Sequence, residues 1–359
     1  MEEWKEYRLG ELLTIKYGKD HKKLHNGSIP AYGSGGIMRY VDKSIYEHPS
    51  ILIPRKGSLN NIIYLSTPFW TVDTMFWTII NTELVNPKYL YYAICKFDFA
   101  GLNVGSAVPS LTVPVIENIK ITLPSLKQQK SIVSILSSLD DKIELNRRIN
   151  KNLEQQAQAL FKSWFADFEP FKDGKFVDSE LGMIPERWKA GNLEELVEVK
   201  YGKDHKKLVS GTIPVYGSGG IMRYVDQYLY NEESVLIPRK GSLNNVMYVN
   251  HPFWTVDTMF YTHMKIEGIA KFIYLLISPK DLLSMNSGSA VPSMTVDILN
   301  KIAVIIPPIT ILQQFESIVK PLFIMAESLQ KENYRLAHLR DTLLPKLMSG
   351  ELKINDLSI

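Results

Sequence analysis

Residues 17–24 read YGKDHKKL, and the same letters return at residues 201–208. Four longer or equally specific stretches return in the same order: YGSGGIMRYVD at 32–42 and 216–226, LIPRKGSLNN at 52–61 and 236–245, PFWTVDTMF at 68–76 and 252–260, and GSAVPS at 105–110 and 288–293. A repeat this long is a duplication of a whole domain, and a chain of 359 residues has room for two domains. We therefore expect two equivalent domains with two equivalent ligand surfaces.

The first part of each copy has the composition of strands and loops. It is rich in glycine, proline, aromatic and β-branched residues, and short apolar runs such as 50–53 and 77–80 lie between turn residues. A helix is expected over 86–96, because Pro87 suits the first helical position.

The second part of each copy has a helical pattern. Residues 126–165 contain no glycine or proline, and apolar residues recur at heptad spacing, which predicts a helix about 60 Å long. A second apolar repeat covers 318–347, where Pro321 predicts a helix start or a bend. Two such helices are expected to pair as an antiparallel coiled coil. Asn146 and Asn150 fall on its seam, and they either set the register or are solvated where the helices splay.

The predicted fold class is therefore α+β, with two tandem strand-rich domains separated by two long helices. The predicted parts are a first domain over 1–123, a first helix over 124–168, a linker over 169–184, a second domain over 185–306, a second helix over 307–350 and a tail over 351–359.

Composition narrows the class of protein. The net charge of +3 permits nucleic-acid binding without demanding it. Cys95 is the single cysteine, so no internal disulfide can form, and a reducing compartment, the cytoplasm, is expected. The first residues lack the apolar core of a signal peptide. The most apolar stretch, 302–312, contains two prolines, so we expect no membrane span.

The motifs of common enzyme sites are missing. The glycine-rich segments at 33–36 and 57–58 fit neither the phosphate-loop nor the dinucleotide spacing, and tight turns explain them better. The seven histidines have no metal-ligand spacing, and no serine lies in a nucleophile elbow. We expect no catalytic residues, no metal site and no cofactor in this chain.

The two copies share polar side chains on loops. Arginine and lysine reach phosphates and guanine, asparagine reaches adenine, and serine reaches either, so the set favours double-stranded DNA as the ligand. The lysines beside His21 make a cationic loop a better interpretation than a catalytic dyad. The candidate DNA-binding residues are Lys19, His21, Lys22, Lys23, Ser34, Arg39, Arg55, Lys56, Ser58, Asn60, Asn61, Ser106 and Ser110, with Lys203, His205, Lys206, Lys207, Ser218, Arg223, Arg239, Lys240, Ser242, Asn244, Asn245, Ser289 and Ser293 in the second copy.

The order of these motifs resembles the specificity subunit of a type I restriction–modification system over essentially the full length. The resemblance rests on the IPxYGSGG, IPRKGS and GSAVPS loops and on Ile184-Pro185-x-x-Trp188 before the second domain. It also rests on the helix start PxxxQQ at 124–129, repeated with an insertion at 308–314, on LFKSWF with DFEP at 160–170, and on LLPKLMSGE at 343–351.

The resemblance implies that this chain is one subunit of a complex whose subunits have different functions. Each target-recognition domain of such a subunit reads one half of a bipartite DNA site, and the long helices space the domains and dock partners. It implies two modification (methyltransferase) subunits, and two restriction subunits in the full complex. S-adenosylmethionine, ATP and magnesium belong to those partners. In this family the two recognition domains usually differ, whereas here they are nearly copies.

Two finer expectations follow. The apolar stripe of the first helix is wider than one partner helix needs, so the residues off the seam are expected to dock the modification subunits: Ile135, Leu145, Ile149, Phe161, Trp164 and Phe165. Equivalent domains about a twofold axis are expected to read a palindromic, or nearly palindromic, bipartite target.

Four alternatives stay open at this point. They are the specificity subunit of a related fused restriction–methylation system, a silent cassette kept for recombination, a stand-alone nuclease with a duplicated fold, and a scaffold or carbohydrate-binding repeat.

Overall fold

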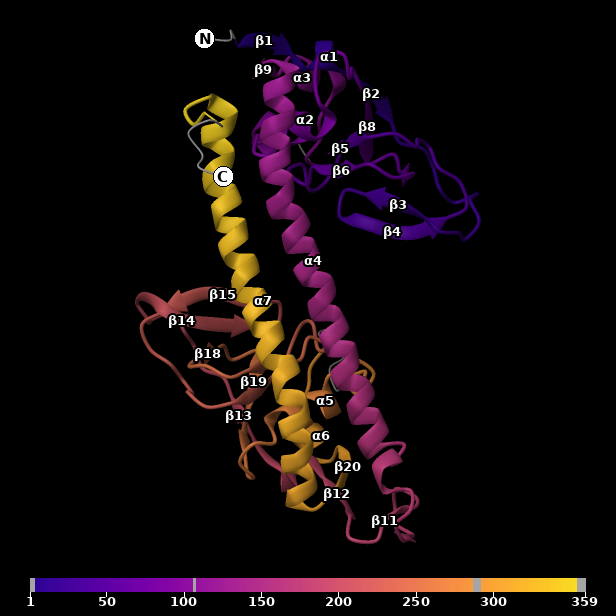
Figure 1. Cartoon of the computed structure of the whole chain (residues 1–359), viewed down its shortest axis with the longest axis vertical. Helices are drawn as coiled ribbons and strands as arrows, with labels where there is room; N and C mark the ends of the chain where they lie inside the picture. The colour runs from indigo at the N-terminus through magenta and orange to yellow at the C-terminus, as the bar shows by residue number, and fades with distance from the viewer. Residues whose placement is uncertain (1–3, 106–107, 287–291, 354–359) are drawn as a thin grey trace. The chain divides into compact units, whose positions relative to one another are not determined.

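The computed structural model describes residues 4–105, 108–286 and 292–353. It contains two compact units: unit 1 comprises Met1–Leu145 with Glu332–Ile359, and unit 2 comprises Asn146–Lys331. The two long helices of Figure 1 are α4 (Leu126–Phe165, magenta) and α7 (Ile309–Ser349, orange to yellow). Each unit therefore holds one strand-rich domain with a segment of both long helices, and the α+β prediction is confirmed.

Two sheets form the recognition domain of unit 1. A four-stranded antiparallel sheet has the order β2-β8-β5-β6, with β2 at Leu13–Tyr17, β5 at Ser50–Pro54, β6 at Ile63–Leu65 and β8 at Met75–Ile80. A three-stranded sheet has the order β4-β3-β7, with β3 at Ile29–Gly33, β4 at Gly36–Val41 and β7 at Trp70–Thr71. The strands expected over 50–53 and 77–80 lie within β5 and β8.

Short elements close this domain onto the start of α4. Strand β1 (Lys5–Arg8) pairs antiparallel with β9 (Lys120–Leu123), which leads directly into the helix. The helices are α1 (Leu9–Leu12), α2 (Pro87–Ile94), α3 (Val113–Glu117) and a 3₁₀ turn at Ala100–Leu102. The expected helix start at Pro87 is confirmed, and the Asn86 side chain caps it by accepting from the backbone N–H groups of Lys88 and Tyr89.

The recognition domain of unit 2 repeats this plan. Its sheets have the orders β13-β19-β16-β17 and β15-β14-β18, and β12 pairs with β20. The strands are β12 Lys189–Asn192, β13 Val197–Tyr201, β14 Ser210–Gly217, β15 Gly220–Val225, β16 Ser234–Pro238, β17 Met247–Val249, β18 Trp254–Thr255, β19 Met259–Met264 and β20 Ala303–Ile306. The helical elements are α5 Ala270–Ile277, α6 Val296–Asn300 and 3₁₀ turns at Leu193–Glu195 and Glu169–Phe171. Before this domain, β10 (Phe176–Val177) pairs with β11 (Ile184–Pro185).

Buried hydroxyl groups join the central strands of each domain in the same way. The Ser50 hydroxyl donates to the Thr78 carbonyl at 2.7 Å, and the Thr78 hydroxyl accepts from the Ile51 backbone N–H at 2.9 Å. Ser234 and Thr262 repeat both kinds of contact in unit 2. Because a buried polar group must be hydrogen-bonded, these pairs stabilise β5 on β8 and β16 on β19 where the strands diverge.

The helix segments within unit 1 run antiparallel, as predicted. Ile132 and Leu136 of α4 share a core with Leu344 and Leu347 of α7. Further along α4, Lys142 lies 3.6 Å from Glu332, an earlier residue of α7. Residue numbers therefore increase along α4 in the direction in which they decrease along α7. In unit 2, Phe165 packs on Phe315 with ring centroids 4.7 Å apart, and Figure 1 shows the two segments there with opposite directions.

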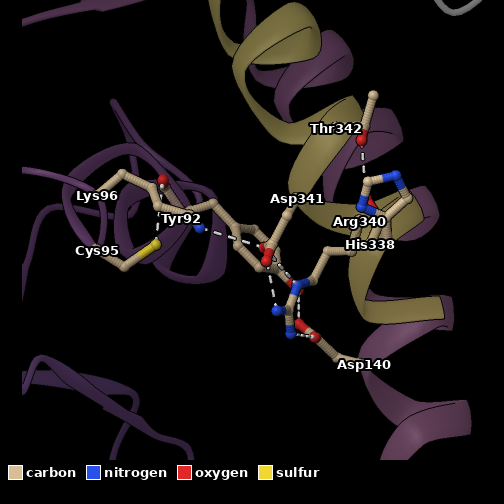
Figure 2. Close-up of polar contacts among 8 residues, drawn as sticks. All are labelled: Tyr92, Cys95, Lys96, Asp140, His338, Arg340, Asp341 and Thr342. Atoms are coloured by element: carbon tan, nitrogen blue, oxygen red, sulfur yellow. Dashed lines mark hydrogen bonds and ion pairs between the residues drawn. The ribbon is translucent and has the colours of Figure 1, made fainter. Parts of the chain in front are cut away.

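A polar network fastens the recognition domain of unit 1 to both helices (Figure 2). The Tyr92 hydroxyl of α2 donates to Asp140 Oδ2 at 2.5 Å, and Arg340 Nη1 donates to Asp140 Oδ1 at 2.7 Å. Lys96 Nζ donates to Asp341 Oδ1 at 3.2 Å. In unit 2, Tyr274 and Gln158 provide different contacts between α5 and α4. The two copies therefore diverge where the domain meets the helices.

The expected start of the second helix at Pro321 was wrong, because α7 begins at Ile309 and continues through Pro321 to Ser349. A bend at Pro321 stays a prediction. Helix α7 is long and apolar enough to cross a membrane by length and composition alone, which is weak evidence because helices of soluble proteins pass the same test. Leu312 and Phe315 are buried in the core of unit 2, and Leu344 is buried in that of unit 1.

The two asparagines of the predicted seam differ in burial. Asn146 is fully buried, and Asn150 is half-buried. A solvated position is therefore wrong for Asn146, and a role in setting the register stays a prediction.

Candidate nucleic-acid interface

The lysine loop, residues 18–26, is held tightly at its first residues. A Cβ on Gly18 would lie 2.0 Å from the Val72 carbonyl oxygen, so only glycine fits there. The Trp70 indole N–H donates to the Lys19 carbonyl at 3.0 Å. Asp20 Oδ1 accepts the Lys22 backbone N–H at 3.0 Å, and this bond, with the nearby lysine, lowers the pKa of the Asp20 carboxyl. The exposed side chains of Lys22 and Lys23 follow this turn.

The second lysine loop, residues 202–210, repeats these contacts. Gly202 has the same close approach to Val256, and the Trp254 indole N–H donates to the Lys203 carbonyl at 2.9 Å. Lys206 and its Asp204 partner reproduce the turn at 3.0 Å. His21 and His205 each have an Nδ1 atom that is buried without a hydrogen-bond partner within the described part of the chain. The equivalence of the two loops thus extends to atomic contacts.

A hairpin tip, residues 33–36 between β3 and β4, lies beside each lysine loop. Gly36 has φ of +116° and its counterpart Gly220 has +113°, a conformation that favours glycine. The Asn61 side-chain amide donates to the Ser34 carbonyl at 2.8 Å, and Asn245 binds Ser218 at the same distance. These bonds hold each tip against the loop that carries the IPRKGS sequence.

An arginine in that loop has a fixed guanidinium group. Arg55 Nη1 donates to the Asp73 carbonyl at 3.1 Å, and its Cζ lies 5.7 Å from the centroid of the Tyr17 ring. Arg239 repeats the geometry at 3.1 Å from the Asp257 carbonyl oxygen and 5.4 Å from the Tyr201 ring. One donor and one ring face orient the planar group while other N–H donors remain for a ligand. The tyrosines, which are more than half exposed, were not among the sequence predictions, although both lie in repeated stretches.

These segments surround one open pocket in each unit. The pocket of unit 1 has a volume of about 900 Å³ and is lined by the lysine loop, the hairpin tip with Ile37 and Met38, and the turn at 72–74. The pocket of unit 2 has a volume of about 490 Å³ and is lined by the equivalent segments, with Ile221 and Met222. Of the predicted residues, His21, Lys22 and Ser34 line the first pocket, and His205 and Ser218 line the second.

Other predicted DNA-binding side chains form hydrogen bonds with the chain itself. Arg39 Nη2 donates to the Leu24 carbonyl at 3.1 Å, which ties the lysine loop to β4, and Arg223 binds Leu208 in the same way. The Asn60 amide binds Asp98, and Asn244 binds Asp281. These side chains position loops within the chain, and contact of Asn60 and Asn61 and their counterparts with adenine stays a prediction.

The remaining predicted residues fall into four groups. Lys56 and Ser110 form an isolated β-bridge, as do Lys240 and Ser293. The carbonyl groups of Ser58 and Ser242 accept turn hydrogen bonds. Lys23 and Lys207 are exposed, while Ser106 and Ser289 lie outside the described residues.

The predicted docking residues are distributed unevenly. Phe161 and Trp164 pack against the core of unit 2, and Phe165 lies in it with 6% of its surface exposed. Ile135 packs against the core of unit 1, and Ile149 is half-buried. Leu145 is the member with half its surface exposed. The expectation that Phe165 faces a partner is corrected, because the core of unit 2 buries it, whereas docking through half-buried Phe161 and Trp164 stays a prediction.

Acidic and histidine side chains do not gather into a metal site. Within residues 4–105, 108–286 and 292–353, no group of three or more histidine, cysteine, aspartate or glutamate residues could hold a metal ion.

Comparison with known proteins agrees with the two-domain geometry. The sequence model described as "Type I restriction modification DNA specificity domain" matches residues 1–155 and 185–336. The chain is 30% identical over 346 residues to the type I restriction enzyme MjaIX specificity subunit of Methanocaldococcus jannaschii, covering 87% of this chain and 80% of that protein. It is 24% identical to the HindI specificity subunit of Haemophilus influenzae, with 82% of each chain covered.

A solved structure shares the fold. The type I restriction–modification S subunit from M. genitalium superposes with a TM-score of 0.62 at 19% identity, covering 96% of each chain. The match of the family model to both repeats, together with the MjaIX similarity, decides the assignment: this chain belongs to the type I restriction–modification DNA specificity family, the non-catalytic component of such systems.

Proposed function

We propose that each recognition domain reads one half of a bipartite DNA target, and that the two halves carry the same sequence on opposite strands. The observation that carries the proposal is the pair of pockets built from the same segments with the same contacts. The unit composition supports it too. Unit 1 combines its domain with the first half of α4 and the last part of α7, and unit 2 combines its domain with the first half of α7 and the last part of α4. Each unit thus consists of the same parts, one strand-rich domain and one segment of each long helix.

The differences between the copies support the same conclusion. Tyr92 of α2 corresponds to Leu275 of α5, and the contacts of these helices with α4 differ accordingly. The residues around the pockets, by contrast, are identical. Divergence at the helices leaves the DNA-facing surfaces equivalent, so equivalent half-sites are expected.

The experiment is a methylome of the host with and without this gene. The proposal predicts a bipartite palindrome, or a motif very close to one, with the same methylated adenine in each half. An asymmetric motif with two unrelated halves would overturn it and would assign base choice to the divergent segments.

Specific side chains divide between base and phosphate contacts in this proposal. Replacement of Arg55 or Arg239 by alanine is expected to cost about 1–3 kcal/mol of specific binding, because the oriented guanidinium suits a bidentate contact with guanine. Replacement of the exposed Lys22 or Lys206 should weaken binding to all sequences and reduce the salt slope by about 0.9. Salt titrations of duplex binding separate the two effects, and unchanged affinity in all four variants would move recognition away from these loops.

We also propose the partners. Two modification subunits dock on the helices and carry S-adenosylmethionine, and two restriction subunits with ATP and magnesium join the full complex in the cytoplasm. Half-exposed Leu145 gives docking a testable residue, and Ile135 and Ile149 are partly buried members on the same helix. Co-purification with the modification subunit should weaken in Leu145→Asp, and a chain that never recruits this subunit would refute the docking. The limits at 1–123, 124–168, 169–184, 185–306, 307–350 and 351–359 remain our proposed domain division.

A further inference from the structure

Each hairpin exposes two adjacent apolar side chains. Ile37 is 51% exposed and Met38 is 57% exposed, and Ile221 and Met222 are 50% and 60% exposed. Exposure of a large apolar residue on a surface strand is common when it occurs singly, whereas an adjacent pair repeated in two domains requires an explanation.

The backbone presents these residues in the same way in both domains. The register places Tyr32 opposite Ile37 and Ala31 opposite Arg39, so Met38 is the extra residue of a β-bulge. Tyr216, Val215 and Met222 form the same irregularity in the second hairpin. Bulges redirect side chains, and here the redirected methionine lies over a glycine, since a Cβ on Gly33 would be 2.7 Å from Met38 Sδ.

The surroundings decide which part of DNA such a surface suits. Ile37 and Met38 line the pocket together with Asp73, and the second pocket has Asp257 in the same place. An apolar wall with a carboxylate repels phosphate, but it matches base edges, which present thymine methyl groups and the amino groups of cytosine and adenine. Lys22 lines the same pocket and supplies a positive charge for the neighbouring DNA backbone.

The hairpin tip is small enough to approach a ligand closely. Ideal Cβ atoms built on Gly35 and Gly36 meet nothing within 4 Å, so the tip has open space around it. Glycine at such a place permits another backbone or a base pair to come near. A two-stranded ribbon also fits the major groove of B-form DNA.

We propose that the two hairpin tips enter the DNA groove and that Ile37 with Met38, and Ile221 with Met222, are specificity-determining apolar contacts to base edges. The proposal deepens the proposed function and rests on it. Because apolar contacts release no counterions, these residues contribute to the preference for the target and not to the salt dependence of binding.

The test uses the full chain co-expressed with its modification subunits. The probes are a duplex carrying the motif identified by the methylome and a scrambled duplex of equal length. The tip variant combines Ile37→Ala, Met38→Ala, Ile221→Ala and Met222→Ala. Met183→Ala, whose side chain is 56% exposed in the linker, is the matched control, and Met38→Gln with Met222→Gln keeps the side-chain shape while adding polarity. Thermal melting verifies the fold of each variant.

The expected result is a loss of at least about tenfold in affinity for the target duplex for each altered domain. Affinity for the scrambled duplex and the salt slope should be unchanged, the glutamine variant should lose preference as well, and Met183→Ala should behave as wild type. A tip variant that still prefers its target as strongly as wild type overturns this inference alone. A tip variant with equal losses on both duplexes and a reduced slope also overturns it, since the tip would then act on phosphates. A wild-type complex without any preference overturns the proposed function and this inference together.

Discussion

Lys271 offers the sharpest test of how the second recognition domain is attached to α7. It lies in the first turn of α5 with 3% of its surface exposed. Its Nζ lies 2.6 Å from Glu316 Oε1 on α7 and 3.0 Å from Glu233 Oε1. The ammonium also lies 5.1 Å from the centroid of the Tyr248 ring. The perturbation is Lys271→Ala, which removes the cation that contacts both carboxylates.

The expected loss of stability in Lys271→Ala depends on the two carboxyl groups that remain without the lysine. Burial raises the pKa of the Glu316 carboxyl even with Lys271 present, so the charged form is already disfavoured. Breaking a buried pair by removing one partner costs about 3–5 kcal/mol. The first copy supplies a matched control, because Lys88 occupies the equivalent position of α2 and lies 3.8 Å from Asp141, whose side chain is 76% exposed. Lys88→Ala should cost less than about 1 kcal/mol.

Differential scanning calorimetry of the full chain measures the difference. For a unit of this size, about 1 kcal/mol shifts the midpoint by roughly 2–4 °C, so Lys271→Ala should lower the unit 2 transition by about 6–20 °C. A carboxyl with a raised folded-state pKa stabilises the fold at low pH and loses this contribution as the pH rises. The Lys271→Ala deficit should therefore be larger at pH 8 than at pH 5.

Two results would refute this reasoning. One is an equal midpoint shift for Lys271→Ala and Lys88→Ala. The other concerns the double variant Lys271→Met with Glu316→Met, which should recover most of the loss because an apolar pair often replaces a buried ion pair without cost. Failure to recover would show that packing of the lysine stem, and not the unpaired charge, sets the effect.

Two further predictions concern His251 and Gly18. Burial lowers the pKa of His251, so protonation of its side chain favours the unfolded state. The melting temperature of unit 2 should therefore fall as the pH drops below about 6.5. His251→Thr introduces the residue found at Thr67 in the first copy and should remove this part of the acid sensitivity in thermal melts. Gly18→Ala places a Cβ 2.0 Å from the Val72 carbonyl oxygen and should lower the free energy of unfolding by about 1–3 kcal/mol or more. The Cβ of Gly35→Ala meets nothing within 4 Å, so this control should melt as wild type. Similar melting midpoints for the two variants would contradict the described contacts.

Local sequence patterns predicted the long helices and their direction well. The absence of glycine and proline from 126–165 gave the bounds of α4, because helix continuity depends on local backbone preference. The same rule failed at Pro321, which is exposed and lies within the continuous helix α7 without ending it. The Asn86-Pro87 pair marked the start of α2, since both residues act on the backbone beside them.

The candidate site was harder to predict because it depends on contacts between distant loops. The repeat identified the right stretches, but it could not say that Asn61 points back to Ser34 or that Arg55 lies over Tyr17. Heptad spacing likewise gave the face on which Phe165 lies without revealing that the chain's own domain covers this face. Ile37 and Met38 escaped notice since apolar residues in a strand look like core until their exposure is known.

Unit 2 is inserted within unit 1 along the chain, and this order has a consequence for synthesis. The ribosome completes every residue of unit 2 before it reaches Leu344 and Leu347, which fill the core against Ile132 and Leu136. The domain that is made first is therefore finished last, and until then its apolar helix face stays uncovered. A nascent chain halted after residue 331 would contain every residue of unit 2 but would lack the part of unit 1 that begins at Glu332, so premature termination leaves one finished unit and one unfinished unit.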